Sequence, residues 1–218
     1  YNISVAIPAS EPEQRWRWVR NGYELLRDKG IPLNPESIGL YQELGRIFQH
    51  KIGGVSDEAH KYYKLQLVRG MEPLIGPATH EYYRSLKEAP KQWSQILESD
   101  QIEEFVRTLE QADPAFAERE DFVKNYLSLR QNPDRFTEEA FEVIDRYRGT
   151  SALEQFDIFA RAYQLRNVWK LEPELMDELN NTYGPIDPED PNKHLPLDWR
   201  HPNTHAIYWA VRGLRTAG

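Results

Sequence analysis

The chain has 218 residues, enough for one domain or two small ones with a buried core. Apolar residues make up 39% of it and aromatic residues 12%, which excludes an intrinsically disordered segment. Its net charge of −8 at pH 7 repels phosphate backbones and anionic lipid surfaces, so we expect no nucleic-acid partner.

The chain contains no Cys, which excludes disulfides, thiolate metal sites and Cys nucleophiles but leaves the cellular compartment open. No run of 18 apolar residues is present, so this segment is expected to hold no membrane span. The chain opens at Tyr1 with neither a Met nor a basic-then-apolar leader. We therefore expect a segment of a larger protein.

Three helices are predicted before residue 76. The first covers 10–29 and begins with a capping-box pattern at Ser10. The second covers 34–52, opened by an Asn-Pro pair and closed by two glycines, and the third covers 56–72. Because so short a turn joins the second and third helices, we expect them to pack antiparallel.

Helical periodicity continues through most of the remaining chain, and most of these segments open with Asp, Thr, Ser or Pro. The predicted helices cover 79–89, 93–97, 100–111, 114–131, 137–148, 151–170, 173–183 and 203–216. Five prolines between residues 184 and 202 predict an extended segment there. Strand signals are almost absent, so the predicted fold class is all-α.

One pair of helices carries a repeat pattern in which small residues lie where the helices cross and large ones fill the space beside them. The pattern consists of Tyr41, Leu44, Gly45, Phe48, Ala59, Tyr63 and Pro73. The segment over about 15–73 therefore resembles tetratricopeptide repeats. The whole chain resembles uncharacterised bacterial proteins with degenerate repeats of this kind, which often carry a membrane anchor elsewhere in the sequence. The resemblance implies antiparallel helical hairpins in an irregular α-solenoid, with Gly45 and Ala59 at the crossing. No second Leu-Gly unit follows residue 76, so a generic helical bundle is the alternative.

The predicted organisation has three regions within one continuous domain. Residues 1–76 form the tetratricopeptide-like hairpin region, and residues 77–183 form a further helical array. Residues 184–218 form the proline-rich segment and the C-terminal helix.

The resemblance also implies a function: repeats of this kind present a groove to a protein or peptide partner. Groove-facing positions belong to the first helix of a unit and are carried here by Gln42, Arg46 and Gln49, which share one polar face at i, i+4 and i+7. We therefore expect a non-enzymatic scaffold without catalytic residues or cofactor. The partner's identity and the oligomeric state stay open, and a structural spacer or oligomerisation segment is a further alternative.

A second hypothesis comes from a different class. His201 and His205 lie four residues apart, and with Asp198 or His194 they could bind zinc in a metal-dependent hydrolase. Pro202 stands where a zinc protease carries its Glu base, and closed zinc sites usually need four ligands. We therefore expect no metal.

Tryptophans define two further expectations. Trp16 and Trp18 alternate with arginines as in single-strand-binding surfaces, but the helical wheel favours packing between neighbouring helices. Trp199 is expected to anchor the proline-rich segment onto the last helix near Ile207 and Ala210. The alternative is an exposed Trp199 that contacts a partner. Ile186, Leu195 and Leu197 are expected to anchor the segment together with Trp199.

Overall fold

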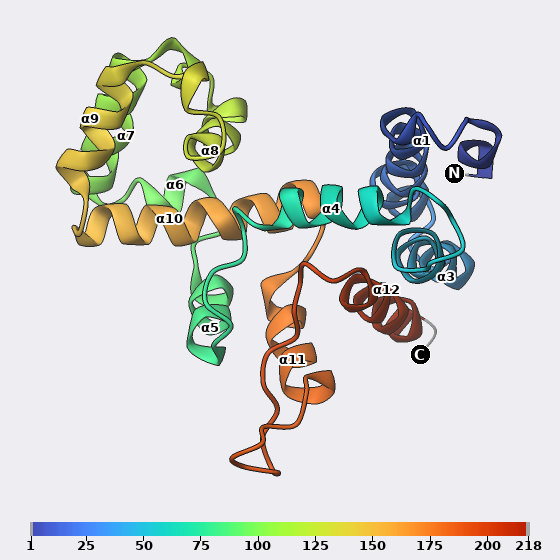
Figure 1. Ribbon diagram of the computed structural model, residues 1–218. Coiled ribbons are helices and arrows are strands. Elements are labelled where there is room, and N and C mark those ends of the chain that lie inside the picture. The colour runs from blue at the N-terminus through green and yellow to red at the C-terminus, as the bar shows by residue number, and fades with distance from the viewer. Residues whose placement is uncertain (1, 217–218) are drawn as a thin grey trace. The chain divides into compact units, whose positions relative to one another are not determined.

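The computed structural model describes residues 2–216 and confirms the all-α class: these residues contain helices, turns and a single isolated bridge between Ile186 and His194. The chain divides into two compact units (Figure 1). The first comprises Tyr1–Ile75 together with Thr182–Gly218, and the second comprises Gly76–Asn181. The C-terminal region therefore belongs to the same unit as the N-terminal region.

The first unit is built from helices at both ends of the chain, and two π-helical segments continue α1 and α3 without a break. Its elements are η1 (Asn2–Ala6), α1 (Pro12–Leu25), η2 (Leu26–Gly30), α2 (Ile31–Leu33), α3 (Ile38–Arg46), η3 (Ile47–Ile52), α4 (His60–Met71) and α12 (Pro202–Thr216). The predicted capping box at Ser10 is absent, because Glu11 is the N-cap and Pro12 opens the helix. Among the described residues, no helix has the length and hydropathy that a membrane span requires.

α3 packs chiefly against α12, which follows it by more than 150 residues. A Cβ at Gly45 would lie 3.5 Å from the Ala206 carbonyl oxygen, and one at Gly213 would lie 2.8 Å from the Cβ of Tyr41. The distance at Gly45 is an ordinary van der Waals contact, whereas Gly213 permits the close approach because a side chain there would clash with Tyr41. The prediction that Gly45 and Ala59 mark a crossing of adjacent helices is wrong, because Gly45 faces α12 and Ala59 lies one residue before α4.

Aromatic rings fill the core of the first unit. Trp16 on α1 stacks on Tyr63 of α4 at a centroid distance of 6.0 Å, and Phe48 of η3 stacks on His205 of α12 at 4.8 Å. Trp16 is buried as predicted, whereas Trp18 remains 37% exposed. Only one face of α1 meets neighbouring helices, so the prediction for Trp18 is wrong.

The second unit contains the helices of the middle of the chain. They are α5 (His80–Glu88), α6 (Trp93–Ile96), α7 (Asp100–Ala112), η4 (Pro114–Phe116), α8 (Arg119–Ser128), η5 (Pro133–Arg135), α9 (Glu138–Tyr147), α10 (Ser151–Gln164), η6 (Leu165–Trp169) and α11 (Pro173–Tyr183). The hydroxyls of Thr79, Thr137 and Thr150 accept backbone amides at the starts of α5, α9 and α10. The predicted helix over 114–131 is interrupted between η4 and α8.

A dense aromatic core holds the second unit together. Trp93 packs against Phe122, Phe156 and Phe159 at centroid distances of 5.6, 6.0 and 5.3 Å. The buried Arg166 of η6 donates hydrogen bonds to carbonyl oxygens at the C-terminal end of α5, including that of Leu86 at 3.2 Å. A guanidinium at this end satisfies carbonyls that have no partner within the helix.

Candidate functional site

The end of the proline-rich segment is anchored on α12. Trp199 is completely buried, and its indole lies edge-on to His205 and Tyr208 at centroid distances of 6.3 and 6.0 Å. The expected anchor on α12 is therefore present, and its aromatic contacts are with His205 and Tyr208. Because the side chain is buried, Trp199 is not available to a partner, and that alternative for Trp199 is wrong.

The residues of the metal hypothesis serve other purposes. His205 is buried, and its Nε2 lies 2.8 Å from the Trp199 carbonyl oxygen. The Nδ1 atom of the exposed His201 accepts the Asn203 amide at 3.2 Å, which caps the start of α12. Within residues 2–216, no group of three His, Asp or Glu side chains is placed to hold a metal ion. The structure therefore does not bring Asp198, His201 and His205 together as ligands.

Burial changes the protonation of His205. Loss of solvent lowers its pKa to about 4, and the positive charge of Arg27 acts in the same direction, although the hydrogen bond to Trp199 opposes them. The imidazole is therefore neutral at pH 7 and acts as a packed, hydrogen-bonded part of the α12 core.

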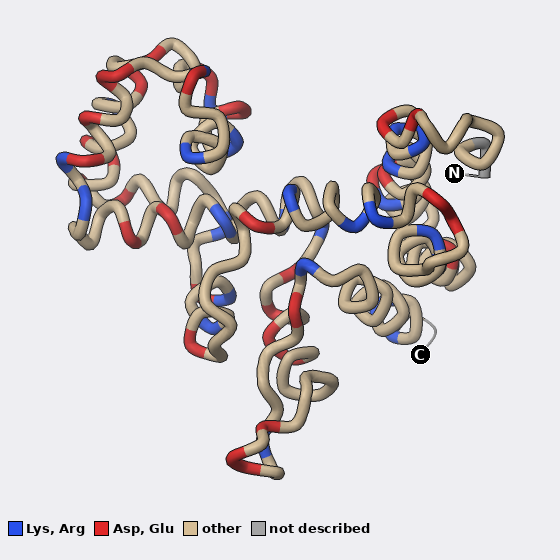
Figure 2. The backbone as a smooth tube through the Cα atoms, viewed as in Figure 1, with Lys and Arg blue, Asp and Glu red and all other residues tan. Residues whose placement is uncertain are grey.

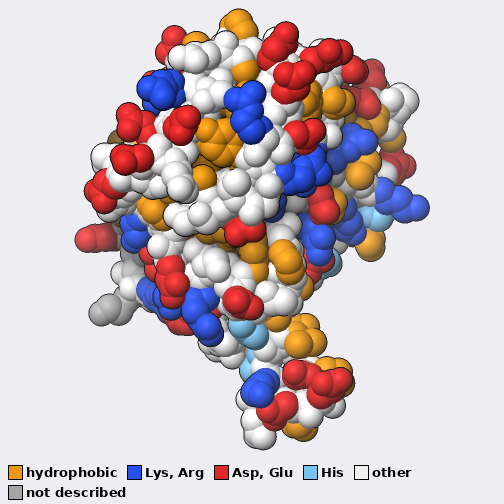
Figure 3. Space-filling model, turned by 90° about the vertical axis from the view of Figure 1, so that its left-hand side faces the viewer, with side chains coloured by type: hydrophobic (Ala, Val, Ile, Leu, Met, Phe, Trp, Pro, Cys, Tyr) orange, Lys and Arg blue, Asp and Glu red, His pale blue; other side chains and the backbone are white. Residues whose placement is uncertain are grey.

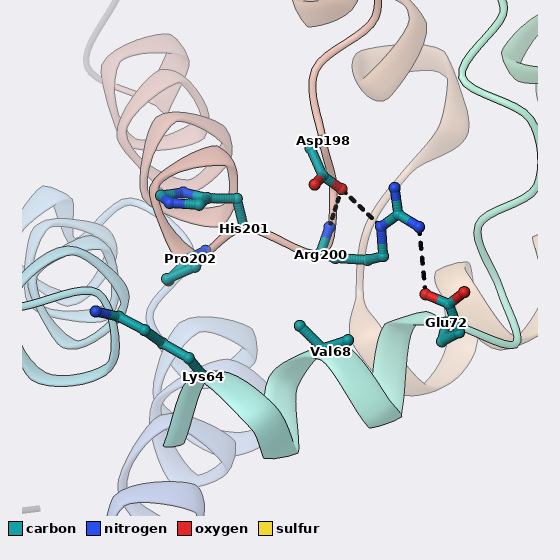
Figure 4. Close-up of a pocket in the computed structure, with 7 residues that line it drawn as sticks. All are labelled: Lys64, Val68, Glu72, Asp198, Arg200, His201 and Pro202. Atoms are coloured by element: carbon teal, nitrogen blue, oxygen red, sulfur yellow. Dashed lines mark hydrogen bonds and ion pairs between the residues drawn. The ribbon is translucent and has the colours of Figure 1, made fainter. Parts of the chain in front are cut away.

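A hollow lies between α4 and the residues that lead into α12 (Figure 4). Its lining comes from two stretches of the first unit: Lys64, Val68, Glu72, Asp198, Arg200, His201 and Pro202. Lys64 and Val68 of α4 and Glu72 directly after it are spaced by four residues, which places them on one helix face. The other four are Asp198, Arg200 and His201 of the proline-rich segment and Pro202, the first residue of α12.

The charged groups of this hollow pair with one another or with backbone oxygens. Arg200 donates to Asp198 at 2.8 Å and to Glu72 at 3.3 Å, as Figure 4 shows. Burial alone would raise the pKa of Asp198, but the hydrogen bonds and charge of Arg200 lower it. Lys64 donates to the Gly54 carbonyl at 3.2 Å. The arrangement holds α4 against the start of α12.

A second charged cluster surrounds Asp57, immediately before α4. Its Oδ1 accepts from Arg15 at 3.0 Å and from the Ala59 amide at 2.9 Å, while its Oδ2 accepts from Lys51 and Tyr63. Burial would raise the pKa of this carboxyl, but the hydrogen bonds from Lys51, Ala59 and Arg15 together lower it. Because each oxygen already accepts two hydrogen bonds, the cluster joins α1, η3 and α4 structurally.

The predicted groove residues lie on the exposed side of α3 and η3. Gln42, Arg46 and Gln49 are all exposed, and the opposite side of α3 packs on α12. Arg46 forms an ion pair with Glu43 at 3.4 Å. The polar face thus exists as predicted, while its role in binding stays a prediction.

The last residue of α11, Tyr183, and the first half of the proline-rich segment form a hairpin over 183–195, which we call the 183–195 hairpin. The Leu195 amide donates to the Pro185 carbonyl at 2.7 Å, and the Asp187 amide donates to the Lys193 carbonyl at 2.9 Å. These bonds flank the isolated bridge between Ile186 and His194. The two arms of the hairpin are therefore joined by backbone hydrogen bonds and do not form an open loop.

Turn chemistry orders the tip of this hairpin. The Asp187 carboxylate accepts the Glu189 amide at 2.8 Å, and the Asp190 carboxylate accepts the Asn192 amide at 3.1 Å. The Lys193 amide closes the turn on the Asp190 carbonyl at 2.9 Å. Asp side chains that accept an amide two residues ahead are typical of turns, and the prolines between them fix further backbone angles.

Large apolar side chains are exposed on the hairpin: Tyr183 is 52% exposed, Ile186 63% and Leu195 41%. In Figure 3 the hairpin is the lowest part of the view, and apolar and acidic side chains lie together on it. The expectation that Ile186 and Leu195 anchor the segment is therefore wrong, because the hairpin turns both side chains outward. The signal that could have shown this was the Asp-Pro-Glu-Asp-Pro-Asn run between them, a turn sequence.

Comparisons with known proteins give no relative: no family model, curated protein or solved structure matches the chain. The resemblance to tetratricopeptide repeats therefore rests on the residues of this chain alone. It stays a prediction, and the pairing of α3 with α12 differs from the adjacent-helix pairing that it implied.

Proposed function

We propose that the chain is a non-enzymatic helical module through which a larger protein binds a protein partner, with the 183–195 hairpin as a contact element. The observation that carries the proposal is the exposure of Tyr183, Ile186 and Leu195 on a hairpin ordered by its own hydrogen bonds. Exposed apolar side chains grouped on one element are typical of interaction sites, whereas scattered ones need no explanation.

The order of the hairpin supports this assignment. Binding by a flexible loop loses affinity because the loop must be ordered on association, whereas a hairpin with a preformed backbone avoids much of that cost. Its base is fixed as well, since Leu197 and Trp199 are buried directly after its last residue. A ligand that binds the exposed side chains would therefore contact a defined surface.

Site-specific photo-crosslinking in the cells that make the protein tests the proposal. A photoreactive amino acid at position 186 is compared with one at position 33, where Leu33 is equally apolar, exposed and in the same unit. We expect one dominant protein adduct from position 186 that position 33 does not give. A third variant at position 49 tests the predicted groove face.

The outcomes separate the hypotheses. No adduct at positions 186 and 49, or the same set of adducts at all three positions, would remove the proposed function. A specific adduct from position 49 alone would keep a binding module but move its contact surface from the hairpin to the α3 face that carries Gln42, Arg46 and Gln49.

A further inference from the structure

We propose that the partner surface for the 183–195 hairpin is an apolar protein cleft whose rim carries Lys or Arg. This inference rests on the proposed function, because it names the chemistry of the partner that the hairpin binds. It follows from the charges at the hairpin tip and from their position relative to the exposed apolar side chains.

The tip carries an excess of negative charge. Asp187, Glu189 and Asp190 lie within four residues, and Lys193 is the one Lys or Arg of the hairpin. Lys193 forms an ion pair with Asp190 at 3.1 Å, so it compensates that carboxylate. Asp187 and Glu189 then leave the tip with two formal negative charges. Figure 2 shows these acidic positions gathered at the turn.

Apolar and acidic groups occupy different parts of the hairpin. Ile186 forms the bridge with His194, and Leu195 is the next residue, so their side chains lie on opposite faces of the hairpin, whereas the carboxylates lie in the turn. A complementary surface must therefore be an apolar cleft that receives both faces, with positive charge beyond it, where the turn ends. Charge complementarity of this kind fixes orientation and speeds association more than it adds affinity.

The same charges argue against other occupants. Phosphate backbones and anionic membranes repel an acidic tip. A second copy of this chain carries a net charge of −8, so association through the hairpin would bring like charges together. A basic-rimmed protein cleft is the class of surface that accepts both the apolar strands and the acidic turn.

Selection from a random twelve-residue peptide library displayed on phage tests this chemistry with the full chain as bait. Peptides are selected on the wild type and counter-selected on an Ile186→Ser/Leu195→Ser variant. We expect the retained peptides to combine aromatic or aliphatic residues with Lys or Arg. Their affinity should fall about tenfold or more for the counter-selection variant, as expected when buried apolar contacts are lost.

Two further variants make the test specific. Asp187→Asn/Glu189→Gln keeps the apolar surface and should weaken the selected peptides several-fold, with a smaller dependence on salt than the wild type shows. Leu25→Ser/Leu33→Ser removes two equally exposed apolar side chains from elsewhere in the first unit and should leave binding unchanged. Unchanged thermal unfolding of all three variants checks that each one folds.

Several results would overturn the inference. They are enrichment of acidic or uncharged peptides, equal loss of binding in the Leu25→Ser/Leu33→Ser control, and failure to retain any peptide after counter-selection. Concentration-dependent dimers of the wild type that the hairpin variant does not form would assign the surface to a second copy. Because the photo-crosslinking experiment uses the cellular partner, it can succeed while this selection fails, which would leave the binding function but remove the basic-rimmed partner.

Discussion

The two halves of the proline-rich segment contain similar residue types, but the apolar side chains of one half are exposed and those of the other are buried. Residues 185–195 and 196–202 both contain prolines and large apolar side chains. In the first half Ile186 and Leu195 are exposed, whereas in the second Leu197 and Trp199 are buried against the first unit. Apolar content therefore does not decide which side chains become anchors. The turn residues decide it, because they fold the first half of the segment back on itself before the chain reaches α12.

The largest expected effect is on the buried half. Trp199→Ala would leave a cavity between the segment and α12 and should lower the free energy of unfolding by about 3 to 5 kcal/mol. Urea denaturation followed by circular dichroism measures the change. A loss below about 1 kcal/mol would show that Trp199 is not the anchor. The two halves of the segment would then not differ in how they contribute to stability.

The same anchor should be sensitive to pH through His205. The pKa of its imidazole is about 4 in the folded chain and about 6.5 in the unfolded chain, so the unfolded state binds an extra proton between these values. Stability should be fully present above pH 6.5 and fall by about 3 kcal/mol as the pH is lowered to 4.

Denaturation series at pH 7 and pH 4.5 measure this loss. His205→Gln should remove most of it, because an amide can still donate to the Trp199 carbonyl but does not titrate. His201→Gln is the matched control and should retain the loss, since His201 is exposed. If the two variants behave alike, His205 is not the titrating group.

A smaller effect is expected where α3 meets α12, the surface that supports the anchor. A methyl group at Gly213 would lie 2.8 Å from Tyr41, so Gly213→Ala should overpack the contact and cost about 1 to 3 kcal/mol. Gly39 on α3 has no atom within 4 Å of an added Cβ. Gly39→Ala is therefore the control and should leave stability unchanged or raise it, by up to about 1 kcal/mol. Equal destabilisation by both changes would contradict the close packing.

Local sequence signals predicted the helices well and their partners poorly. Capping residues and apolar periodicity placed α5, α9 and the continuous stretch of α10 and η6 within one residue at each end, because both signals act within a single helix. The pairing of Gly45 with α12 depends on residues more than 150 positions away, and no pattern near Gly45 specifies them. For the hairpin, the apolar identity of Ile186 and Leu195 suggested burial, although the turn residues between them determined the outcome.

The smallest expected effect on stability is at the exposed half of the segment, and there the comparison is sharpest. Ile186→Ser and Leu195→Ser each replace an exposed apolar side chain, so the free energy of unfolding should change by no more than about 0.5 kcal/mol. Leu197→Ser lies two residues after Leu195 but exchanges a buried side chain for a polar one, and it should cost several times more. Urea denaturation of the three variants shows whether the loss of stability follows the burial of the replaced side chain or only its apolar character. A large loss in Ile186→Ser or Leu195→Ser would mean that the hairpin is packed rather than available, and its assignment as a contact element would then fail.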